Sequence, residues 1–221
     1  MSDHVAKMAL FDGLVTAAKA LSSGRRAEII DVLAQGPRPV EQVAAEVEQS
    51  VPNTSRHLQV LLRAGLVRTR RDGNHIYYAL ADDRVGELWA ILRGVAAEQV
   101  AEIERLAAAY LGERGQLQTV TRAELKRRLG GDTVVLDVRP SPEYKAGHIA
   151  GAISVPINEL PSRLQDLPPD ADVVAYCRGP YCVYADEAVR ILRRRGQRAA
   201  RLEDGYPEWA RAELPVERPA R

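Results

Sequence analysis

The feature that most constrains this 221-residue chain is the stretch 173–195, which holds both of its cysteines. An apolar run of strand type (173–176) ends abruptly at Cys177, a short loop with Gly179 and Pro180 follows, and apolar residues then recur at helical spacing. In a strand–loop–helix, a cysteine at the end of the strand faces successive backbone N–H groups and a helix N-terminus, which favour the thiolate. We therefore expect Cys177 to be a nucleophile of low pKa. The alternative is a small core residue, as free cysteines often are.

The composition is that of a globular protein, with 46% hydrophobic and 28% charged residues and a net charge of +1. No overall field recruits nucleic acid, so any basic binding site must be local. Two cysteines five residues apart exclude a secreted disulfide framework. The first ten residues carry an acidic residue and no apolar core of signal-peptide length, and no window approaches a membrane span. We expect a cytoplasmic location and no membrane partner.

The first half of the chain predicts a helix-turn-helix followed by a hairpin. Apolar residues recur at helical spacing in four segments, 5–20, 25–33, 40–47 and 51–64. Strand-type residues in 66–71 and 75–80 then flank a turn that contains Asp-Gly. A hairpin placed directly after a helix-turn-helix is a wing.

A local basic surface in this half favours DNA as a partner. Residues 56–71 contain no acidic residue and five arginines, at positions 56, 63, 68, 70 and 71. A charge run is usually a solvated face, but this one covers the second helix of the motif and the hairpin together.

Three stretches here, Leu21–Leu33, Thr54–Val67 and Arg71–Tyr78, resemble the ArsR/SmtB family of winged-helix repressors. The resemblance covers about residues 5–110 and implies a homodimer that binds palindromic double-stranded operator DNA. It places on the recognition helix Ser50, Asn53, Thr54, Ser55, Arg56 and His57.

Within this implied DNA-binding set, Asn53 and Arg56 suit base edges. The hydroxyl groups of the helix suit phosphates, as do Arg70 and Arg71 of the wing. His57 is interpreted as a DNA-backbone or packing residue and not as a ligand.

Metal sensors of this family carry a cysteine on the helix before the turn, or Asp/His and His/Glu pairs on the last helix. Here 40–47 has no cysteine and the helix predicted for 83–110 has no histidine, so we expect no metal site and no cofactor. That last helix has a long apolar stripe, which is either core or a surface for a partner chain; its length favours the partner. A two-fold dimer would present two recognition helices about 34 Å apart.

The second half predicts a small parallel α/β sheet. A capping box at 121–124 opens a helix, and buried-type strands at 133–137, 173–176 and 199–202 alternate with helices. The active loop is then expected at the carboxyl end of a strand. We thus predict two domains, a mainly α winged helix-turn-helix domain at 1–112 and an α/β domain at 118–221, joined by a linker at 113–117.

The pieces Leu136–Ala152, Pro156, Cys177 and Leu202–Trp209 resemble the rhodanese homology domain, in the family's order. The resemblance spans about residues 116–217. In rhodaneses the cysteine accepts a sulfane sulfur from a donor such as thiosulfate and passes it to a thiophile. The resemblance thus implies that Cys177 carries the sulfur.

The resemblance also implies roles for neighbouring residues. The loop amides from Arg178 to Val183, except that of Pro180, would cradle a persulfide, and Arg178 could hold an anionic donor. The persulfide loop consists of Arg178, Gly179, Pro180, Tyr181, Cys182 and Val183. A motif that in this family mainly braces the sheet corresponds to Asp137, Arg139, Glu143 and His148.

The loop departs from common sulfurtransferase patterns at Gly179, Pro180 and Cys182, which puts turnover with thiosulfate in question. Cys182 is a second thiol able to attack a Cys177 persulfide and give a disulfide or polysulfide bridge; the alternative is a buried structural cysteine. Phosphatases and arsenate reductases place arginine six residues after a similar cysteine, where this chain has Val183. A doubly charged oxyanion would lack its main counter-charge, which disfavours that class.

Together these features predict a dimeric DNA-binding transcriptional regulator whose rhodanese domain senses or transfers sulfane sulfur through a Cys177 persulfide. Thiosulfate, polysulfide or a persulfide would be the donor. Two alternatives stay open: a thiosulfate-type sulfurtransferase with DNA binding as a secondary role, and an inert rhodanese fold used as a docking module.

Overall fold

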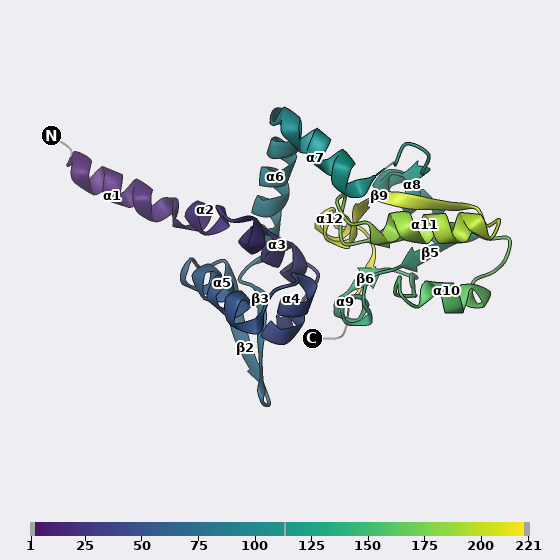
Figure 1. Cartoon of the computed structure of the whole chain (residues 1–221), viewed down its shortest axis with the longest axis horizontal. Helices are drawn as coiled ribbons and strands as arrows, with labels where there is room; N and C mark the ends of the chain where they lie inside the picture. Colours follow the sequence, from purple (N-terminus) through teal and green to yellow (C-terminus); the bar gives the residue numbers. More distant parts are fainter. Residues whose placement is uncertain (1–2, 113, 219–221) are drawn as a thin grey trace. The chain divides into compact units, whose positions relative to one another are not determined.

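A computed structural model describes residues 3–112 and 114–218 of the chain (Figure 1). It forms two compact units, Met1–Arg93 and Gly94–Arg221. Glu113 of the predicted linker lies outside the described residues, as do residues 1–2 and 219–221 at the outer ends of the predicted domains.

The first unit is mainly helical. Its helices are α1 (His4–Leu14), α2 (Thr16–Leu21), α3 (Gly24–Leu33), α4 (Val40–Glu46), α5 (Val51–Arg63) and the first part of α6 (Asp83–Gln99). The apolar faces of α3, α4 and α5 form one core around Ile29, Val43 and Leu58, all fully buried. α1 has no buried residue and extends away from the rest of its unit (Figure 1).

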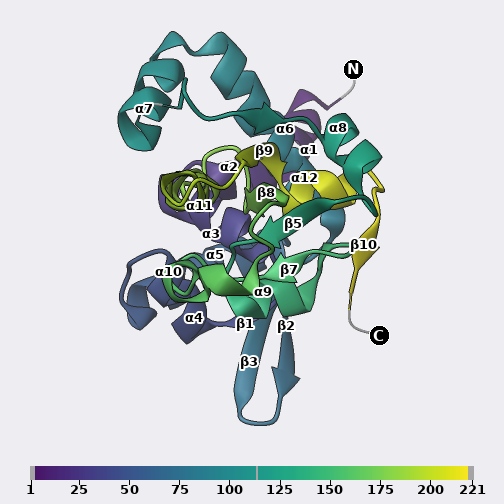
Figure 2. The same cartoon turned by 90° about the vertical axis from the view of Figure 1, so that its right-hand side faces the viewer.

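A three-stranded antiparallel sheet completes the first unit. It has the order β1 (Arg38–Pro39), β3 (His75–Leu80), β2 (Val67–Asp72). The β2–β3 turn contains Gly73 with φ 56°, a left-handed conformation that favours glycine. The hairpin projects beyond α4 and α5 of its unit (Figure 2), so the predicted winged helix is confirmed.

The second unit is built on a five-stranded parallel sheet of order β4-β9-β8-β5-β7. Its strands are β4 (Thr119–Val120), β5 (Thr133–Asp137), β7 (Ile153–Ser154), β8 (Asp172–Cys177) and β9 (Ala199–Gly205), with a separate pair β6 (His148–Ile149) and β10 (Val216–Glu217). Its helices are α7 (Ala101–Leu111), α8 (Arg122–Arg128), α9 (Ser141–Ala146), α10 (Leu160–Arg163), α11 (Tyr184–Arg194) and α12 (Tyr206–Arg211), with a 3₁₀ turn at Leu164–Asp166.

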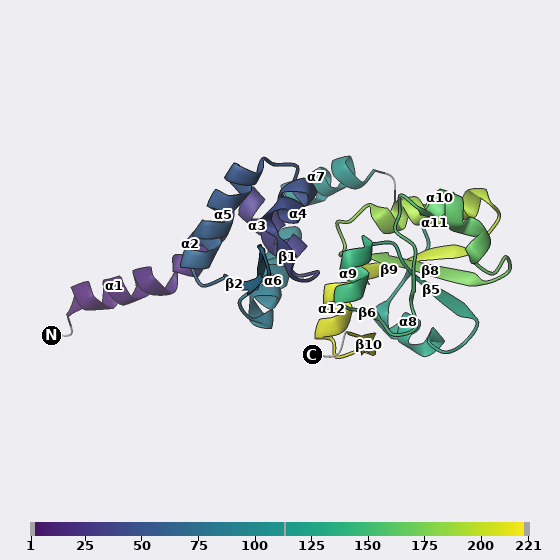
Figure 3. The same cartoon turned by 90° about the horizontal axis from the view of Figure 1, so that it is seen from below.

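Helices cover both faces of this sheet. Helices α10 and α11 lie on one face of the sheet and α8 and α12 on the other (Figure 3), and residues of each pair belong to a separate buried apolar cluster. β8 lies in the middle, and its residues from Val173 to Cys177 are all buried, as expected of a continuous apolar run in a parallel sheet. The predicted α/β fold is confirmed, and Cys177 ends the central strand at its carboxyl end.

The helix predicted for 83–110 is interrupted. α6 ends at Gln99, Val100 takes an extended conformation (φ −108°, ψ 97°), and α7 begins at Ala101. Within the described ranges, no helix combines the length and the apolar character that crossing a membrane requires.

Candidate functional site

The two cysteines lie at opposite ends of one short loop. Cys177 is the last residue of β8 and is 1% exposed, whereas Cys182 is half-buried and stands two residues before α11. Both are free thiols, and each shifts the pKa of the other. The Cys177 thiol also faces the carbonyl oxygens of Gly179 (3.9 Å) and Cys182 (3.8 Å).

Backbone amides from both ends of the loop act on the two sulfurs. Those of Gly179 and Ala185 lower the pKa of Cys177, and those of Arg178 and Tyr184 lower the pKa of Cys182. The cradle of amides from Arg178 to Val183 stays a prediction, and Tyr184 and Ala185, which also act on the sulfurs, lie beyond that range.

The pKa shifts of Cys177 and Cys182 differ from the prediction. Burial raises the pKa of Cys177 well above its ordinary value, and the hydrogen bond to Cys182 raises it further. The hydrogen bond from Cys177 lowers the pKa of Cys182, and the amides of Tyr184 and Arg178 lower it as well, against the effect of burial. The prediction of a low pKa for Cys177 is wrong because its strand end lies in the apolar core, so Cys182 is the thiol of the pair that ionises more readily.

Arg178 is engaged within the protein. Its Nε and Nη2 atoms donate to Glu143 Oε1 at 2.9 and 2.5 Å, and its guanidinium lies over the ring of Tyr184. Glu143 is fully buried on α9, so this ion pair fixes the start of the loop. The expectation that Arg178 holds an anionic donor stays a prediction; in this arrangement Glu143 occupies the Nε–Nη2 edge of its guanidinium.

The rest of the loop is tightly packed. Gly179 is buried, whereas Pro180, Tyr181 and Val183 are half-buried. Gly205, at the end of β9, runs against the start of the loop so closely that a Cβ there would lie 2.3 Å from Gly179 N. This close approach requires glycine at position 205.

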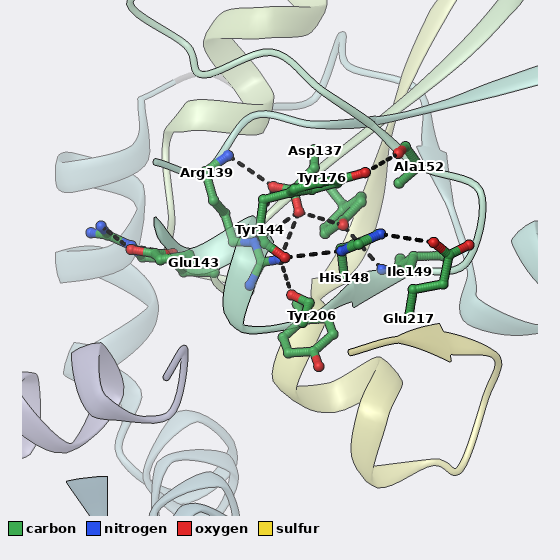
Figure 4. A network of polar contacts seen from close by, with 12 residues as sticks. Asp137, Arg139, Glu143, Tyr144, His148, Ile149, Ala152, Tyr176, Tyr206 and Glu217 are labelled. Atoms are coloured by element: carbon green, nitrogen blue, oxygen red, sulfur yellow. Dashed lines mark hydrogen bonds and ion pairs between the residues drawn. The ribbon is translucent and has the colours of Figure 1, made fainter. Parts of the chain in front are cut away.

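The remaining residues of the rhodanese-like motif form a buried bracing network (Figure 4). Arg139 Nη2 donates to Asp137 Oδ2 at 2.6 Å and to the Gly147 carbonyl at 2.8 Å. The Tyr176 hydroxyl donates to Asp137 Oδ2 at 2.5 Å, and burial together with Asp137 raises the pKa of Tyr176, so it stays a donor.

His148 lies at the outer side of this network. Its ring stacks on Tyr144 with centroids 3.7 Å apart, and its Nε2 is 3.2 Å from Glu217 Oε2 (Figure 4). None of these contacts reaches a cysteine, in accordance with the bracing role expected of the motif. Among the described residues, no group of three or more His, Cys, Asp or Glu side chains gathers in a way that could hold a metal ion.

One residue near the cysteines was not anticipated from the sequence. Arg114, assigned to the linker, donates from Nη1 to the Pro180 carbonyl at 2.5 Å and from Nη2 to the Cys182 carbonyl at 2.9 Å. Its Nε is 2.5 Å from Asp186 Oδ2 on α11. No local pattern marks this arginine, because its partners lie more than 60 residues further along the chain.

The predicted DNA-binding residues divide by exposure. On and just before α5, Ser50, Asn53 and Arg56 are exposed, and Ser55 and His57 are half-buried. Arg70 and Arg71 are exposed on the wing; Arg70 is 3.3 Å from Asp72, and Arg71 donates to the Gly73 carbonyl.

Thr54 departs from this pattern. Its side chain is fully buried against the core of the first unit, and its hydroxyl has no hydrogen-bond partner. The predicted phosphate contact of Thr54 is therefore wrong for this conformation, because the residue lies on the same inner face of α5 as Leu58 and Leu61.

Comparison with known proteins agrees with both halves. Residues 23–69 match the model of the bacterial regulatory protein arsR family, and residues 121–212 match the rhodanese-like domain. An HTH-type transcriptional regulator of Mycobacterium tuberculosis is 47% identical over 96% of this chain and 93% of its own length. A sulfurtransferase of Allochromatium vinosum is 35% identical over 40% of this chain and 81% of its own length.

Among solved structures, a homodimeric winged helix-turn-helix DNA-binding domain of Mycobacterium bovis is 40% identical, covers 46% of this chain and 93% of its own, and has a TM-score of 0.42. The full-length relative and the two domain matches identify the chain. It belongs to the ArsR family of HTH-type transcriptional regulators and carries a C-terminal rhodanese domain.

Proposed function

We propose that this regulator senses sulfane sulfur through its cysteine pair and changes its affinity for operator DNA in response. One observation carries the proposal: two free thiols stand at the two ends of one short loop, and the Cys177 sulfur lies 3.8 Å from the Cys182 carbonyl oxygen. A persulfide adds an anionic sulfur, and backbone amides stabilise such an anion without a cationic side chain.

In the proposed first chemical step, Cys182 acts as the base and Cys177, at the strand end, receives the sulfur. The Cys182 thiolate takes the proton of Cys177, and the Cys177 sulfur attacks the terminal sulfane sulfur of an inorganic polysulfide. The S–S bond of the donor breaks, and the shortened polysulfide leaves with the electron pair. The products are a Cys177 persulfide anion and a Cys182 thiol.

A second step converts the persulfide into a bridge. Cys182 attacks the Cys177 sulfur, displaces the outer sulfur as hydrosulfide, and gives up its proton to that leaving group. The two cysteines lose two electrons, which the sulfane sulfur gains. The result is a Cys177–Cys182 disulfide that reduction by a thiol reverses.

DNA binding is assigned to α5 and the wing. Asn53 and Arg56 are exposed on the helix, where they suit base edges, and Arg70 and Arg71 are exposed on the hairpin, where they suit phosphates. A homodimer is supported by large apolar side chains that stand exposed on α1 and α6, among them Val5, Leu10, Leu14 and Ile91.

The test measures operator affinity before and after polysulfide treatment. Full-length protein selects its operator duplex from a randomised pool under reducing conditions, and fluorescence anisotropy then gives Kd for both states. We expect the wild type to change its Kd at least severalfold and the Cys177→Ser variant to bind equally in both states. Equal Kd values for the treated and untreated wild type would refute the proposal.

The Cys182→Ser variant separates the two chemical steps. Intact-mass spectrometry is expected to find one added sulfur that persists on this variant, whereas the wild type proceeds to a species that has lost two hydrogens. Added sulfur on Cys182 in the wild type, with Cys177 unmodified, would reverse the assigned roles.

Sulfur transfer as an enzyme is the second candidate, favoured by the match to the rhodanese-like domain and by the place of Cys177 at a strand end. Thiosulfate is a poor fit because Glu143 already occupies the Nε–Nη2 edge of Arg178 and neutralises its charge. Turnover of thiosulfate and cyanide that Cys177→Ala abolishes would support this function. Absence of turnover with thiosulfate, polysulfide and glutathione persulfide would exclude it.

A further inference from the structure

Residues 114–118, which precede β4, are bound to the second unit. Gln116 accepts a hydrogen bond through its carbonyl from Arg193 Nη1 at 2.8 Å, and the Gln118 carbonyl accepts one from Arg201 N at 2.9 Å. Leu117 packs against the apolar cluster that contains Cys177. This connector therefore moves with the rhodanese domain and does not behave as a loose tether.

Arg114 makes the connection to the cysteine loop. Its guanidinium donates to the carbonyls of Pro180 and Cys182, at 2.5 and 2.9 Å, and its side chain is 21% exposed. The Cys182 carbonyl also lies 3.8 Å from the Cys177 sulfur. Any covalent change that repositions the loop must therefore alter the hydrogen bonds of Arg114.

A buried carboxylate fixes the other side of the same guanidinium. Asp186 is fully buried and faces two arginines, Arg114 at 2.5 Å and Arg201 at 2.9 Å. Burial lowers the pKa of Arg201, and the positive charge of Arg114 lowers it further, which shows that the two cations are close. The three side chains carry a net positive charge beside the cysteine pair, which favours a thiolate or persulfide anion there.

We propose that Arg114 is the positioning residue that couples the covalent state of the cysteine pair to DNA binding. This role rests on the proposed function, because it names the route by which that signal leaves the rhodanese domain. Formation of the Cys177–Cys182 bridge draws residue 182 toward residue 177, pulls its carbonyl away from Arg114, and shifts the connector that continues from α7. α7 follows directly on α6, which belongs in part to the DNA-binding unit.

Coupling of this kind is reciprocal. If the bridge changes operator affinity by a given factor, operator DNA changes the equilibrium between dithiol and bridge by the same factor, typically between about fivefold and 150-fold. A residue with a merely structural role in the loop would not transmit the effect of DNA to the thiols. Titration of the pair with a dithiothreitol redox buffer, with and without operator, measures the effect.

Two variants separate the charge of Arg114 from its hydrogen bonds. Arg114→Gln removes the charge and most of the bonds, whereas Arg114→Lys keeps the charge but cannot reach three partners at once. Arg105→Gln is the matched control: Arg105 lies on α7, its side chain is 71% exposed, and it contacts Glu102. All three variants are to be measured as full-length proteins, with circular dichroism as the check that each is folded.

In both Arg114 variants we expect polysulfide to modify the cysteines, as judged by intact mass, while Kd for the operator no longer differs between the two states. Arg105→Gln should respond like the wild type, and operator DNA should shift the redox equilibrium only in the wild type and this control. A full wild-type response in both Arg114 variants would overturn the coupling role alone. A wild type that does not respond to polysulfide would overturn both this role and the proposed function.

Discussion

At the scale of single residues, the two thiols should react at different pH values. The pKa of Cys182 is lowered and that of Cys177 is raised, and only the thiolate reacts with iodoacetamide. As pH rises, Cys182 should therefore be alkylated first, and the pH midpoint of its alkylation should lie below the ordinary pKa of a cysteine. The midpoint for Cys177 should lie above that pKa. Each unit between the two pKa values gives about a tenfold difference in thiolate fraction at a pH below both.

Peptide mapping after alkylation at several pH values measures this order. In Cys177→Ala the hydrogen bond to Cys182 is lost, so the midpoint for Cys182 should move to higher pH. Faster labelling of Cys177 than of Cys182 in the wild type would contradict the assignment. Equally slow labelling of both thiols near neutral pH would favour an inert docking module.

Thr54 offers a second prediction at this scale. Its hydroxyl is buried without a partner, so Thr54→Val, a change of nearly equal volume, should leave stability unchanged or raise it by about 1 kcal/mol. Operator affinity should not change, because this side chain does not reach the surface. Urea unfolding and anisotropy measure the two quantities.

Arg56→Ala is the comparison for Thr54→Val. Arg56 is exposed on the same helix, and loss of a base contact costs about 1–3 kcal/mol of binding. A loss of affinity in Thr54→Val as large as in Arg56→Ala would mean that α5 rearranges to expose Thr54 to DNA.

At the scale of elements, β9 approaches the loop between Cys177 and Cys182 so closely that position 205 should tolerate no side chain. Gly205→Ala places a methyl group 2.3 Å from Gly179 N, so the loop must shift, at a cost of about 1–3 kcal/mol. The same shift should change the alkylation rate of Cys182. Gly131→Ala is the control, because its nearest contact would be an ordinary 3.4 Å.

Urea unfolding and peptide mapping check both parts of this prediction. Unchanged stability and labelling in Gly205→Ala would show that the loop can relax away from β9 without cost.

The elements themselves were largely predictable, because their signals are local. The apolar run of β8, its end at Cys177 and the periodicity of α11 predicted the strand, loop and helix correctly. The break at Val100 was missed, because the apolar stripe continues across it and no glycine or proline marks it.

The chemistry of the loop was predicted less well, because it depends on contacts between distant residues. Glu143 precedes Arg178 by 35 residues and occupies the guanidinium that was assigned to a donor. The burial that raises the pKa of Cys177 comes from strands and helices packed around it, and the sequence near Cys177 does not reveal it. Only position within the folded domain decides which of two nearby thiols ionises.

At the scale of the whole molecule, exposed apolar side chains on the first unit predict self-association. Leu10 of α1 and Ile91 of α6 are 61% and 66% exposed, and burial of such groups between two chains is favourable. The double variant Leu10→Asp, Ile91→Asp should be monomeric and should lose at least about tenfold in operator affinity, because a dimer binds two half-sites.

Analytical ultracentrifugation measures the association state. Ile76→Asp is the control for association, since Ile76 is 51% exposed on the wing, where it pairs with Arg71 of β2. A wild type that sediments as a monomer at micromolar concentration, or a double variant that stays dimeric, would contradict this prediction.

The position of Arg114 has a consequence for protein engineering. It precedes the segment 121–212 that the rhodanese-like model covers, although its guanidinium binds the loop inside that segment. A biosensor made by grafting only that segment onto another repressor would keep both thiols but lose Arg114, so on the proposed coupling role its DNA binding should not respond to polysulfide. A graft that starts before residue 114 would bring the missing guanidinium with it.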